Sequence, residues 1–218
     1  MKKAPLISII IPILNRCTEI KVTLDSIVKQ NFDAIEVVLS DGGSSDQSVD
    51  CVLAELARAG MDVTVIIAPG SSVYEAINLG KQIARGEWLY VLGSGDRLYD
   101  ETVLQAVARR LQTTSADVVY GDAWFERSPG FVYGGLFWLN RFNVHNICHQ
   151  SIFYRASVVR SLGVVYNEKY KILADWDYNI KLFSRLRFEH VPLIIAKYAC
   201  YGLSDSQYDA LFYADLQA

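Results

Sequence analysis

Residues 6–14 read LISIIIPIL, a nearly unbroken run of large apolar side chains. Such a run is typical of a strand that is buried on both faces, as in the centre of a parallel sheet, and its isoleucines favour a strand. Two lysines precede the run, as they would in a short signal peptide. However, Pro12 interrupts it, and Asn15 and Arg16 follow where a cleavage site has small residues. We therefore interpret residues 6–14 as a central strand.

Helices and strands alternate outward from this strand. Apolar residues recur at helical spacing after residue 19 and again after residue 48, and Gly60 is well placed to end the second helix. Ser72, with Glu75 three positions later, predicts a third helix that reaches about residue 85. The alternation predicts βαβ units, and hence the α/β class with a mostly parallel central sheet flanked by helices. Further strands are predicted at residues 35–40, 62–68, 87–93 and 117–121, and a fourth helix at residues 103–111.

The pattern changes after residue 120. Residues 124–142 hold seven aromatic side chains and several glycines, which predicts a hairpin or a mobile loop. Residues 150–155 and 191–202 are interpreted as two more strands, and residues 174–186 as a helix. We find no internal repeat, low-complexity tract or linker, and therefore expect a single domain over residues 1–218.

The composition limits the class of protein. The chain has 218 residues, of which 51% are hydrophobic and 21% charged, so a disordered chain is excluded. The net charge of −3 argues against a protein that wraps nucleic acid. No apolar stretch approaches the roughly 20 residues that span a bilayer. The four cysteines form no C-x-x-C pair, so we expect reduced thiols in a cytoplasmic protein.

Polar residues follow each of the first four predicted strands. In open α/β sheets, ligands bind at the carboxyl ends of the strands. The loops carry neither G-x-G-x-x-G nor a P-loop, but they do carry carboxylates, which repel phosphate unless a divalent cation lies between. Asp96, on a glycine-rich turn after a buried strand, is the natural cation ligand. The four polar segments are NR (15–16), SDGGSSD (40–46), PGSSVYEAINLG (69–80) and GSGD (93–96).

Five segments, in order, resemble the family 2 nucleotide-sugar glycosyltransferases of the GT-A fold, and the resemblance spans nearly the whole chain. It implies a nucleotide-sugar-binding half over residues 1–120 and an acceptor-binding half over residues 121–218. A single matched segment would be weak, whereas five in register are specific. The segments are ISIIIPILNR (7–16), SIVKQNFDAIEVVLSDGGSSDQS (26–48), SVYEAINLGKQIARGEWLYVLGSGD (72–96), HQSIFYR (149–155) and ADWDYNIKL (174–182).

The resemblance assigns donor-binding roles residue by residue. Asp41 matches the aspartate that accepts a hydrogen bond from the nucleobase. Glu75, where the family usually has aspartate, and Asn78 lie where the family approaches the ribose and diphosphate. The family's first loop, which lines the base and the ribose, is matched here by Pro12, Asn15 and Arg16.

The metal motif and the catalytic pair depart from the family pattern. The D-x-D motif reads Ser94-Gly95-Asp96, so the first carboxylate is missing, as in one sub-branch of the family. Ser94 is thus expected at the donor, and Asp96 is left as the clear ligand for Mn²⁺ or Mg²⁺. The glutamate of the family's "ED" pair is Ala174, and Asp175 matches the general base. Metal dependence is left open by these departures.

Each assignment has a structural alternative. Asp41 and Asp96 also suit turns, and Asp175 suits a helix N-cap. Glu75 also suits a capping box, and Arg16 an ion pair with Glu19 or Asp46. Two histidines lie in the right region, but lone histidines are usually structural; these are His145 and His149. Three aromatics are equally core residues or platforms for an acceptor sugar ring, namely Trp124, Tyr133 and Trp138.

The resemblance implies an inverting glycosyltransferase of hexosyl or N-acetylhexosaminyl type. An acceptor hydroxyl would attack the anomeric carbon of a donor, with a UDP-sugar favoured, as the nucleoside diphosphate leaves. The implied acceptor is a saccharide or a lipid-linked molecule in polysaccharide biosynthesis, with no nucleic acid partner. A homodimer and a peripheral contact with the inner face of the membrane are left open.

Two other functions compete with this one. A catalytically silent nucleotide-sugar-binding module is suggested by the degraded D-x-D motif. A nucleotidyltransferase with the same sheet should have a glycine-rich, basic loop after the first strand. The segment PILNRCTE (12–19) has one basic residue and no glycine, which ranks the nucleotidyltransferase last.

Overall fold

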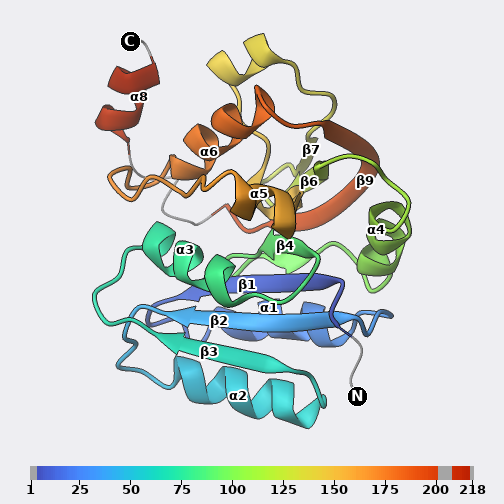
Figure 1. Cartoon of the computed structure of the whole chain (residues 1–218). Coiled ribbons are helices and arrows are strands. Elements are labelled where there is room, and N and C mark those ends of the chain that lie inside the picture. The colour runs from blue at the N-terminus through green and yellow to red at the C-terminus, as the bar shows by residue number, and fades with distance from the viewer. Residues whose placement is uncertain (1–3, 201–207, 217–218) are drawn as a thin grey trace.

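A computed structural model describes residues 4–200 and 208–216 and has the expected α/β architecture (Figure 1). Within the described residues, a nine-stranded sheet has the order β3-β2-β1-β4-β8-β6-β9-β5, and β7 pairs with β6. The first half of the chain supplies the strands β1 (Ile7–Ile13), β2 (Ile35–Asp41), β3 (Val63–Ile67), β4 (Trp88–Val91) and β5 (Arg97–Leu98). The second half supplies β6 (Val118–Phe125), β7 (Phe131–Tyr133), β8 (Ile152–Arg155) and β9 (Phe188–Tyr198).

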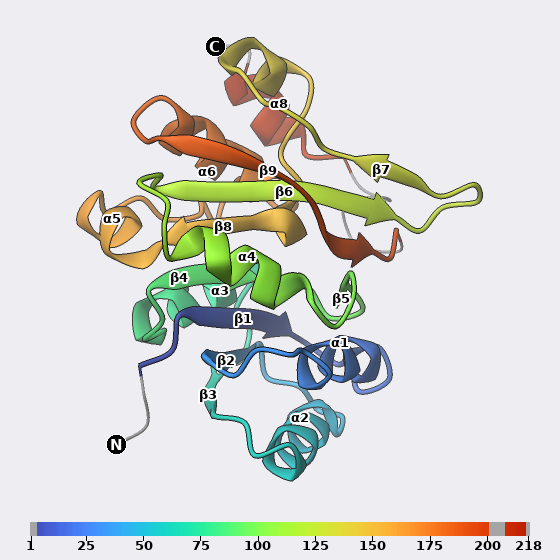
Figure 2. The same cartoon turned by 90° about the vertical axis from the view of Figure 1, so that its right-hand side faces the viewer.

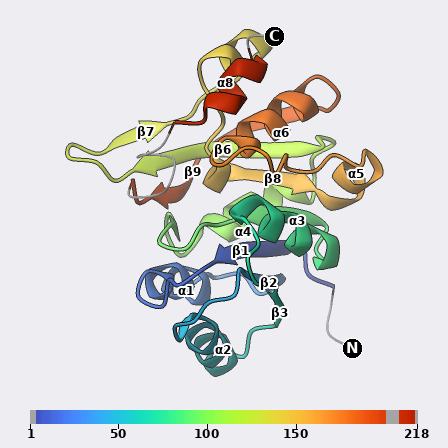
Figure 3. The same cartoon turned by 90° about the vertical axis from the view of Figure 1, so that its left-hand side faces the viewer.

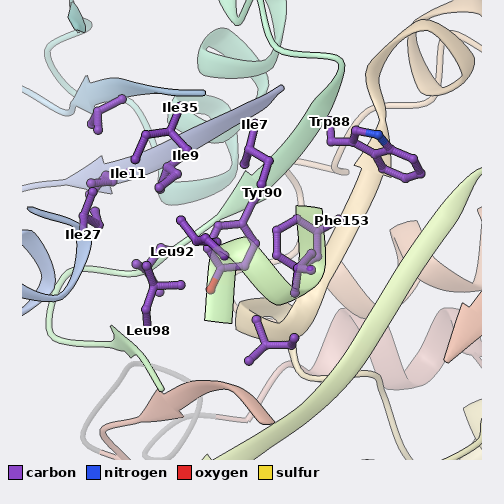
Figure 4. Packing of buried hydrophobic residues seen from close by; sticks show 14 of the residues in the cluster. Ile7, Ile9, Ile11, Ile27, Ile35, Trp88, Tyr90, Leu92, Leu98 and Phe153 are labelled. Atoms are coloured by element: carbon purple, nitrogen blue, oxygen red, sulfur yellow. The ribbon is translucent and has the colours of Figure 1, made fainter. Parts of the chain in front are cut away.

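Strand β1 lies inside the sheet, as its apolar run predicts. It pairs in parallel with β2 on one side and with β4 on the other. Ile7, Ile9 and Ile11 face one core, where Figure 4 shows them clustered with Tyr90 and Phe153. Ile10 lies in a second core on the opposite face. Burial on both faces explains why the run carries almost no polar residue.

Helices cover both faces of the sheet. The first core is closed by α1 (Ile20–Val28), α2 (Ser48–Arg58) and α4 (Val103–Leu111). The second core is closed by α3 (Val73–Ile83), α5 (Ala156–Ser161), α6 (Ala174–Phe183) and α8 (Ala210–Leu216). Figure 2 looks onto α4, and Figure 3 looks onto α3 and α6 on the other side. None of the helices in the described residues is long and apolar enough to cross a membrane.

The second half of the chain joins the sheet differently. Strand β8 pairs antiparallel with both β4 and β6, whereas β6 and β9 run parallel. Parallel ladders still account for most of the paired residues. The aromatic region after residue 124 forms the predicted hairpin, in which β6 extends to Phe125 and pairs with β7. This hairpin projects from the body in Figure 2, and two short 3₁₀ helices follow it, η1 (Leu139–Asn143) and η2 (His149–Ser151).

Several boundaries differ from the sequence-based prediction. Strand β4 ends at Val91 rather than at residue 93, because the chain enters the GSGD turn there. Strand β9 begins at Phe188, three residues earlier than predicted, since it pairs with β6 from that point. The last two residues of the predicted strand, 201 and 202, lie outside the described residues. The short elements β5, α5 and α8 were not predicted.

Candidate active site

A cleft of about 1230 Å³ opens at the carboxyl ends of β1 and β4. The start of α3 and the start of α6 form its sides, and the aromatic hairpin and the end of β9 complete the wall. Of the nine residues that the sequence singles out, five line this cleft: Pro12, Arg16, Ser94, Asp96 and Asp175. The other four do not line it: Asn15, Asp41, Glu75 and Asn78.

The loop after β1 is held by its own side chains. Asn15 has a left-handed backbone (φ 51°), and its Oδ1 accepts a hydrogen bond from the Ser45 amide at 2.8 Å. This bond ties the first loop to the loop that follows β2. Arg16 lines the cleft, and its guanidinium pairs with Glu19 at 3.0 Å in an exposed position. The ion-pair alternative for Arg16 is therefore realised, but an exposed pair of this kind contributes about 0–1 kcal/mol and is easily exchanged for a ligand.

Asp41 ends β2 and faces its own loop rather than the cleft. Its side chain is buried, and its carboxylate accepts bonds from the amides of Gly43 (3.0 Å) and Ser44 (2.9 Å). The Ser44 hydroxyl donates a further bond at 2.5 Å. These contacts are the turn chemistry that its sequence context also suggested. In this conformation the Asp41 carboxylate is bonded within its own loop and does not line the cleft.

Glu75 and Asn78 lie on α3 and are not among the residues that line the cleft. Ser72 caps the helix by accepting the Glu75 amide at 3.2 Å, and the Glu75 side chain is exposed to solvent. Asn78 is buried and binds the backbone of Tyr166 twice, as a donor to its carbonyl at 2.9 Å and as an acceptor from its amide at 3.0 Å. Asn78 thereby fastens the segment before α6 against α3.

The GSGD turn places Asp96 at the floor of the cleft. A Cβ on Gly93 would lie 2.7 Å from Asp96 Oδ2, so only glycine leaves room for the carboxylate. Gly95 has φ +103°, which favours glycine. Gln150 donates to Asp96 Oδ2 at 2.8 Å, and the Ala199 amide donates to Oδ1 at 2.9 Å. The carboxylate is thus held by one residue just before β8 and by one residue just after β9.

The residues around Asp96 fit a cation that is shared with a diphosphate, and do not fit a cage made by protein alone. Across residues 4–200 and 208–216, no group of three or more His, Cys, Asp or Glu side chains could hold a metal. The buried Ser94 hydroxyl has no hydrogen-bond partner among the described residues, so it is available to a ligand beside Asp96. Mg²⁺ is commonly held by one or two carboxylates together with substrate phosphates and water.

Asp175 lies in the first turn of α6 and opens into the same cleft. Its Oδ1 accepts the Tyr74 hydroxyl at 3.0 Å, and its Oδ2 accepts the Asn146 amide at 2.7 Å. Burial raises the pKa of Asp175 to about 6, and the bonds from Tyr74, from the helix N-terminus and from Asn146 oppose that rise. A carboxyl with a pKa near neutrality is suited to accept a proton at physiological pH.

The wall beyond Asp175 is aromatic. Tyr133 lines the cleft from the hairpin, and its hydroxyl donates to the Asn146 carbonyl at 2.6 Å. Trp176 lines it from α6. Two of the three aromatics suggested by the sequence are absent from the lining, because Trp124 packs on the hairpin and Trp138 is 58% exposed.

Both histidines of the region line the cleft. His145 is exposed at its edge. His149 is partly buried, and its Nε2 lies 3.0 Å from the Tyr166 hydroxyl. Burial, reinforced by Lys81, lowers the pKa of His149 to about 3, so the ring is neutral at physiological pH and offers no charge to a phosphate.

Sequence reasoning missed several lining residues. Tyr74 lies within a matched segment, but nothing in its spacing distinguishes it from a core tyrosine. Asn146 and Lys171 lie outside every matched segment. Gln150 directly follows His149 in a matched segment, and its contact with Asp96 depends on the pairing of β8 with β4. Such contacts need the three-dimensional arrangement.

Comparison with known sequences gives a consistent picture. The profile described as "Glycosyl transferase family 2" matches residues 8–161. A Mycobacterium bovis protein named PGL/p-HBAD biosynthesis glycosyltransferase is 40% identical over 216 residues, with 96% of this chain and 83% of that protein covered. Glycosyltransferase GlyG of Streptococcus pneumoniae is 28% identical over 129 residues, with 59% of this chain and 42% of that protein covered.

Solved structures share the fold at low sequence identity. TarS of S. aureus (residues 1–349) in complex with UDP-GlcNAc has a TM-score of 0.80 at 16% identity, covering 96% of this chain and 64% of TarS. The mannosyltransferase PcManGT from Pyrobaculum calidifontis, solved with GDP-Man and Mn²⁺, has a TM-score of 0.72 at 17% identity, covering 92% of this chain and 59% of that one. The chain thus spans less than two thirds of each of these structures.

Proposed function

The chain belongs to glycosyl transferase family 2 and has the GT-A fold, and we propose that it transfers a sugar from a nucleotide-diphosphate donor, a UDP-sugar, with inversion at the anomeric carbon. One observation carries the proposal. Two carboxylates in different environments, Asp96 and Asp175, line one cleft. The cleft is large enough for a donor and an acceptor together. Asp96 is fixed at the floor by two donors, whereas Asp175 has a pKa raised to about 6.

We assign the donor to the side of the cleft formed by the ends of β1 and β4. Pro12 and Arg16 line this side, and the guanidinium of Arg16 is free to exchange Glu19 for a phosphate oxygen. Ser94 and Asp96 lie next to it. A structural relative binds UDP-GlcNAc and another binds GDP-Man, which supports a nucleotide sugar without choosing between the two bases. Hexosyl and N-acetylhexosaminyl transfer both remain within the proposal.

A divalent cation, Mn²⁺ or Mg²⁺, is part of the proposal. Asp96 would hold it, with the Ser94 hydroxyl beside it, and a structural relative was solved with Mn²⁺. When bound, the cation would neutralise the charge that grows on the leaving diphosphate. Within the described residues no group of three or more His, Cys, Asp or Glu side chains is present to hold the cation, so the diphosphate would complete its coordination.

Asp175 is proposed as the general base. A nucleophilic hydroxyl must lose its proton as it attacks the anomeric carbon, and a carboxylate within hydrogen-bond reach can take that proton. Tyr74 bonds one oxygen of Asp175 and Asn146 bonds the other, and the carboxylate lines the cleft, where an acceptor hydroxyl can approach it. Attack from the Asp175 side, opposite the leaving group, inverts the anomeric centre.

The acceptor is assigned to the aromatic side of the cleft. Phe125, Tyr133 and Tyr198 line this side, and rings of this kind stack on sugar rings and on apolar groups. The 40% identical relative is named for PGL/p-HBAD biosynthesis. We propose a saccharide or lipid-linked acceptor in surface glycan biosynthesis, reached either at the membrane periphery or in solution.

The test measures the release of nucleoside diphosphate from UDP-, GDP- and dTDP-sugars with Mn²⁺, after a thermal-shift screen has selected the donor. Asp96→Asn should weaken donor binding at least tenfold, and Asp175→Asn should lower kcat by about 10²–10⁴ with the donor KM nearly unchanged. The matched controls are Asp100→Asn, which lies just beyond the GSGD turn, and Asp177→Asn, which pairs with Lys181 at 2.6 Å in the same helix turn. Both controls should retain activity.

Three results would contradict parts of the proposal. Full activity in Asp175→Asn would remove the assigned base. A product that keeps the donor's anomeric configuration, as seen by NMR, would remove inversion. Donor binding without turnover on any acceptor would favour the catalytically silent module that the missing first carboxylate of the D-x-D motif suggests.

A further inference from the structure

A chain of hydrogen bonds leads from the protein interior to Asp175. The Tyr154 hydroxyl donates to Asn179 Oδ1 at 2.7 Å. Asn179 Nδ2 donates to Asn146 Oδ1 at 2.9 Å. Asn146 Nδ2 then donates to Asp175 Oδ2 at 2.7 Å. The three donors come from β8, from α6 and from the segment before η2, so elements far apart in the sequence meet at one carboxylate.

The series of hydrogen bonds begins at a buried side chain and ends at a side chain that lines the cleft. Tyr154 is 2% exposed and Asn179 is fully buried, whereas Asn146 and Asp175 line the cleft. Polar side chains this deeply buried are costly unless they are hydrogen-bonded, and these are satisfied by one another. The apolar second core surrounds Tyr154 and Asn179, so solvent does not compete for the bond between them.

The three bonds all point the same way. An ionised carboxylate can only accept, so the amide of Asn146 must turn its NH₂ toward Asp175 and its oxygen toward Asn179. Asn179 must then offer its own NH₂ to Asn146 and its oxygen to a donor, which the Tyr154 hydroxyl supplies. A flip of either amide would set two donors or two acceptors against each other. Aligned bonds of this kind strengthen one another.

We infer that Tyr154, Asn179 and Asn146 act as positioning residues that orient Asp175 and hold it ionised against the effect of burial. The hydrogen bonds are defined by their geometry alone, whereas their importance for catalysis rests on the proposed role of Asp175 as the general base. The Tyr74 hydroxyl contacts the other oxygen of the carboxylate at 3.0 Å and shares its single proton with the Ile172 carbonyl at 2.5 Å.

The groups that interact with Asp175 allow its titration to be read cleanly. Tyrosines face it from α3, from β7 and from β8, and a further tyrosine and a cysteine from the adjoining segments. Burial raises the pKa of each of these groups, so all are neutral below about pH 8. They are Tyr74, Tyr133, Cys148, Tyr154 and Tyr166. The cleft also holds Glu168, Lys171, His145 and the neutral His149.

Lys81 is the neighbouring group that could be confused with Asp175. Burial lowers its pKa to about 7, and its ammonium donates to the Tyr178 hydroxyl at 2.8 Å. Tyr178 packs against Tyr154 with ring centroids 5.3 Å apart, and among the described residues its hydroxyl bonds to Lys81 rather than to the hydrogen-bonded chain. Tyr178→Phe is therefore a control of matched size and burial for Tyr154→Phe.

The experiment follows the Asp175 carboxyl by ¹³C NMR from pH 4 to pH 9, with the resonance assigned by its loss in Asp175→Asn. We expect its midpoint to rise by about 1 pH unit in Asn146→Ala and by about half a unit in Tyr154→Phe, because each variant removes support for the charged form. Tyr178→Phe should leave the midpoint in place. The low-pH limb of kcat should move upward by the same amounts, with the donor KM unchanged.

The outcomes separate the two claims. A midpoint that does not move in either Asn146→Ala or Tyr154→Phe, in proteins whose circular dichroism matches the wild type, would overturn the positioning role. Asn146 is only half-buried, so its variant remains a test even where Tyr154→Phe is unstable. A midpoint that moves while the kcat profile stays fixed would uphold the chain and remove Asp175 as the base. If the low-pH limb of kcat moves only in Tyr178→Phe, that limb reports the titration of Lys81 rather than that of Asp175.

Discussion

At the scale of single residues, Asp175 is held in a setting that opposes folding. Its pKa in the folded protein is about 6, above the ordinary value of 3.8. Between these two values the folded state keeps a proton that the unfolded chain has released. Stability therefore falls as pH rises through this window and is not regained above it. Active sites commonly sacrifice stability in this way.

This gives a prediction for Asp175→Asn, which carries no charge at any pH. The free energy of unfolding of the variant, relative to the wild type, should increase by about 2 kcal/mol between pH 4 and pH 7.5. Urea unfolding at the two pH values measures it. Asp177→Asn serves as the control, since Asp177 is paired with Lys181 near the surface. An equal difference between Asp175→Asn and the wild type at both pH values would show that the carboxyl is not under strain.

Sequence reasoning located the loops of the site better than the direction of their side chains. Asp96 and Asp175 both line the cleft, as expected from matched motifs. Asp41 lies in an equally good match but turns its carboxylate into its own loop. A motif fixes the place of a residue along the chain, whereas the hydrogen bonds available to it in three dimensions decide where it points.

At the scale of elements, one buried carboxylate joins β1, β2 and the start of β4. Glu36 is 1% exposed and accepts the Ser8 hydroxyl at 2.6 Å, the Gly86 amide at 3.2 Å and the Arg85 guanidinium at 2.7 Å. Burial alone would raise the pKa of Glu36, but the bonds from Ser8 and Arg85 hold it below its usual value. Its stabilising effect is therefore present above the unfolded pKa and is lost as pH falls through the folded one.

We predict that Glu36→Gln lowers the free energy of unfolding by about 1–3 kcal/mol at pH 7, because one buried donor then faces an amide NH₂, whereas Arg85 is largely exposed and keeps Asp62 at 4.0 Å. The deficit should shrink at acidic pH, as the pH falls through the lowered pKa of Glu36 and the wild-type side chain itself becomes protonated. Chemical denaturation at both pH values measures it. Glu55→Gln removes an exposed pair with Arg58 and should change stability by less than about 0.5 kcal/mol. A similar loss in both variants would contradict the special role of Glu36.

The first turn of helix α3 can serve either as a helix cap or as part of the donor site. Ser72→Ala should destabilise the protein by about 1 kcal/mol, because the Glu75 amide loses its acceptor. Glu75→Gln should leave the donor KM within about twofold, since its side chain is exposed and off the cleft. Thermal unfolding and donor kinetics measure the two effects. A large rise in donor KM in Glu75→Gln would restore the role that the resemblance assigned to it.

Long periodic elements were predictable, and short ones were not. The segments that form β1, β2 and α3 show the apolar pattern of a strand or of a helix over seven or more residues. Strand β5 has two residues and exists only because β9 passes beside it. Helix α5 is too short for its period to be distinguished from the preceding strand. Such elements are defined by their neighbours and leave no periodic signal in the sequence.

At the scale of the whole molecule, the two halves of the chain share one sheet. Strand β4 pairs with β1 of the first half and with β8 of the second, so no break separates the halves at the sheet. Both cores also draw residues from both halves. We propose that residues 1–218 form a single folding unit.

This proposal predicts one cooperative transition on unfolding. Trp176 lies in the second half and Trp88 in the first, so tryptophan fluorescence samples both, while far-UV circular dichroism samples the whole chain. The two probes should give the same urea midpoint. Single-tryptophan variants of each half provide the control. Two separated midpoints would show that the halves fold independently.

The hydrogen-bonded chain behind Asp175 also limits where a proton can go. Two of its three donors are amide NH₂ groups, which orient a neighbour but do not pass protons along. A proton received by Asp175 therefore has no exit through the interior. It must leave through the mouth of the cleft, carried by water or by the departing diphosphate. Resetting the base for the next cycle is thus coupled to the emptying of the site.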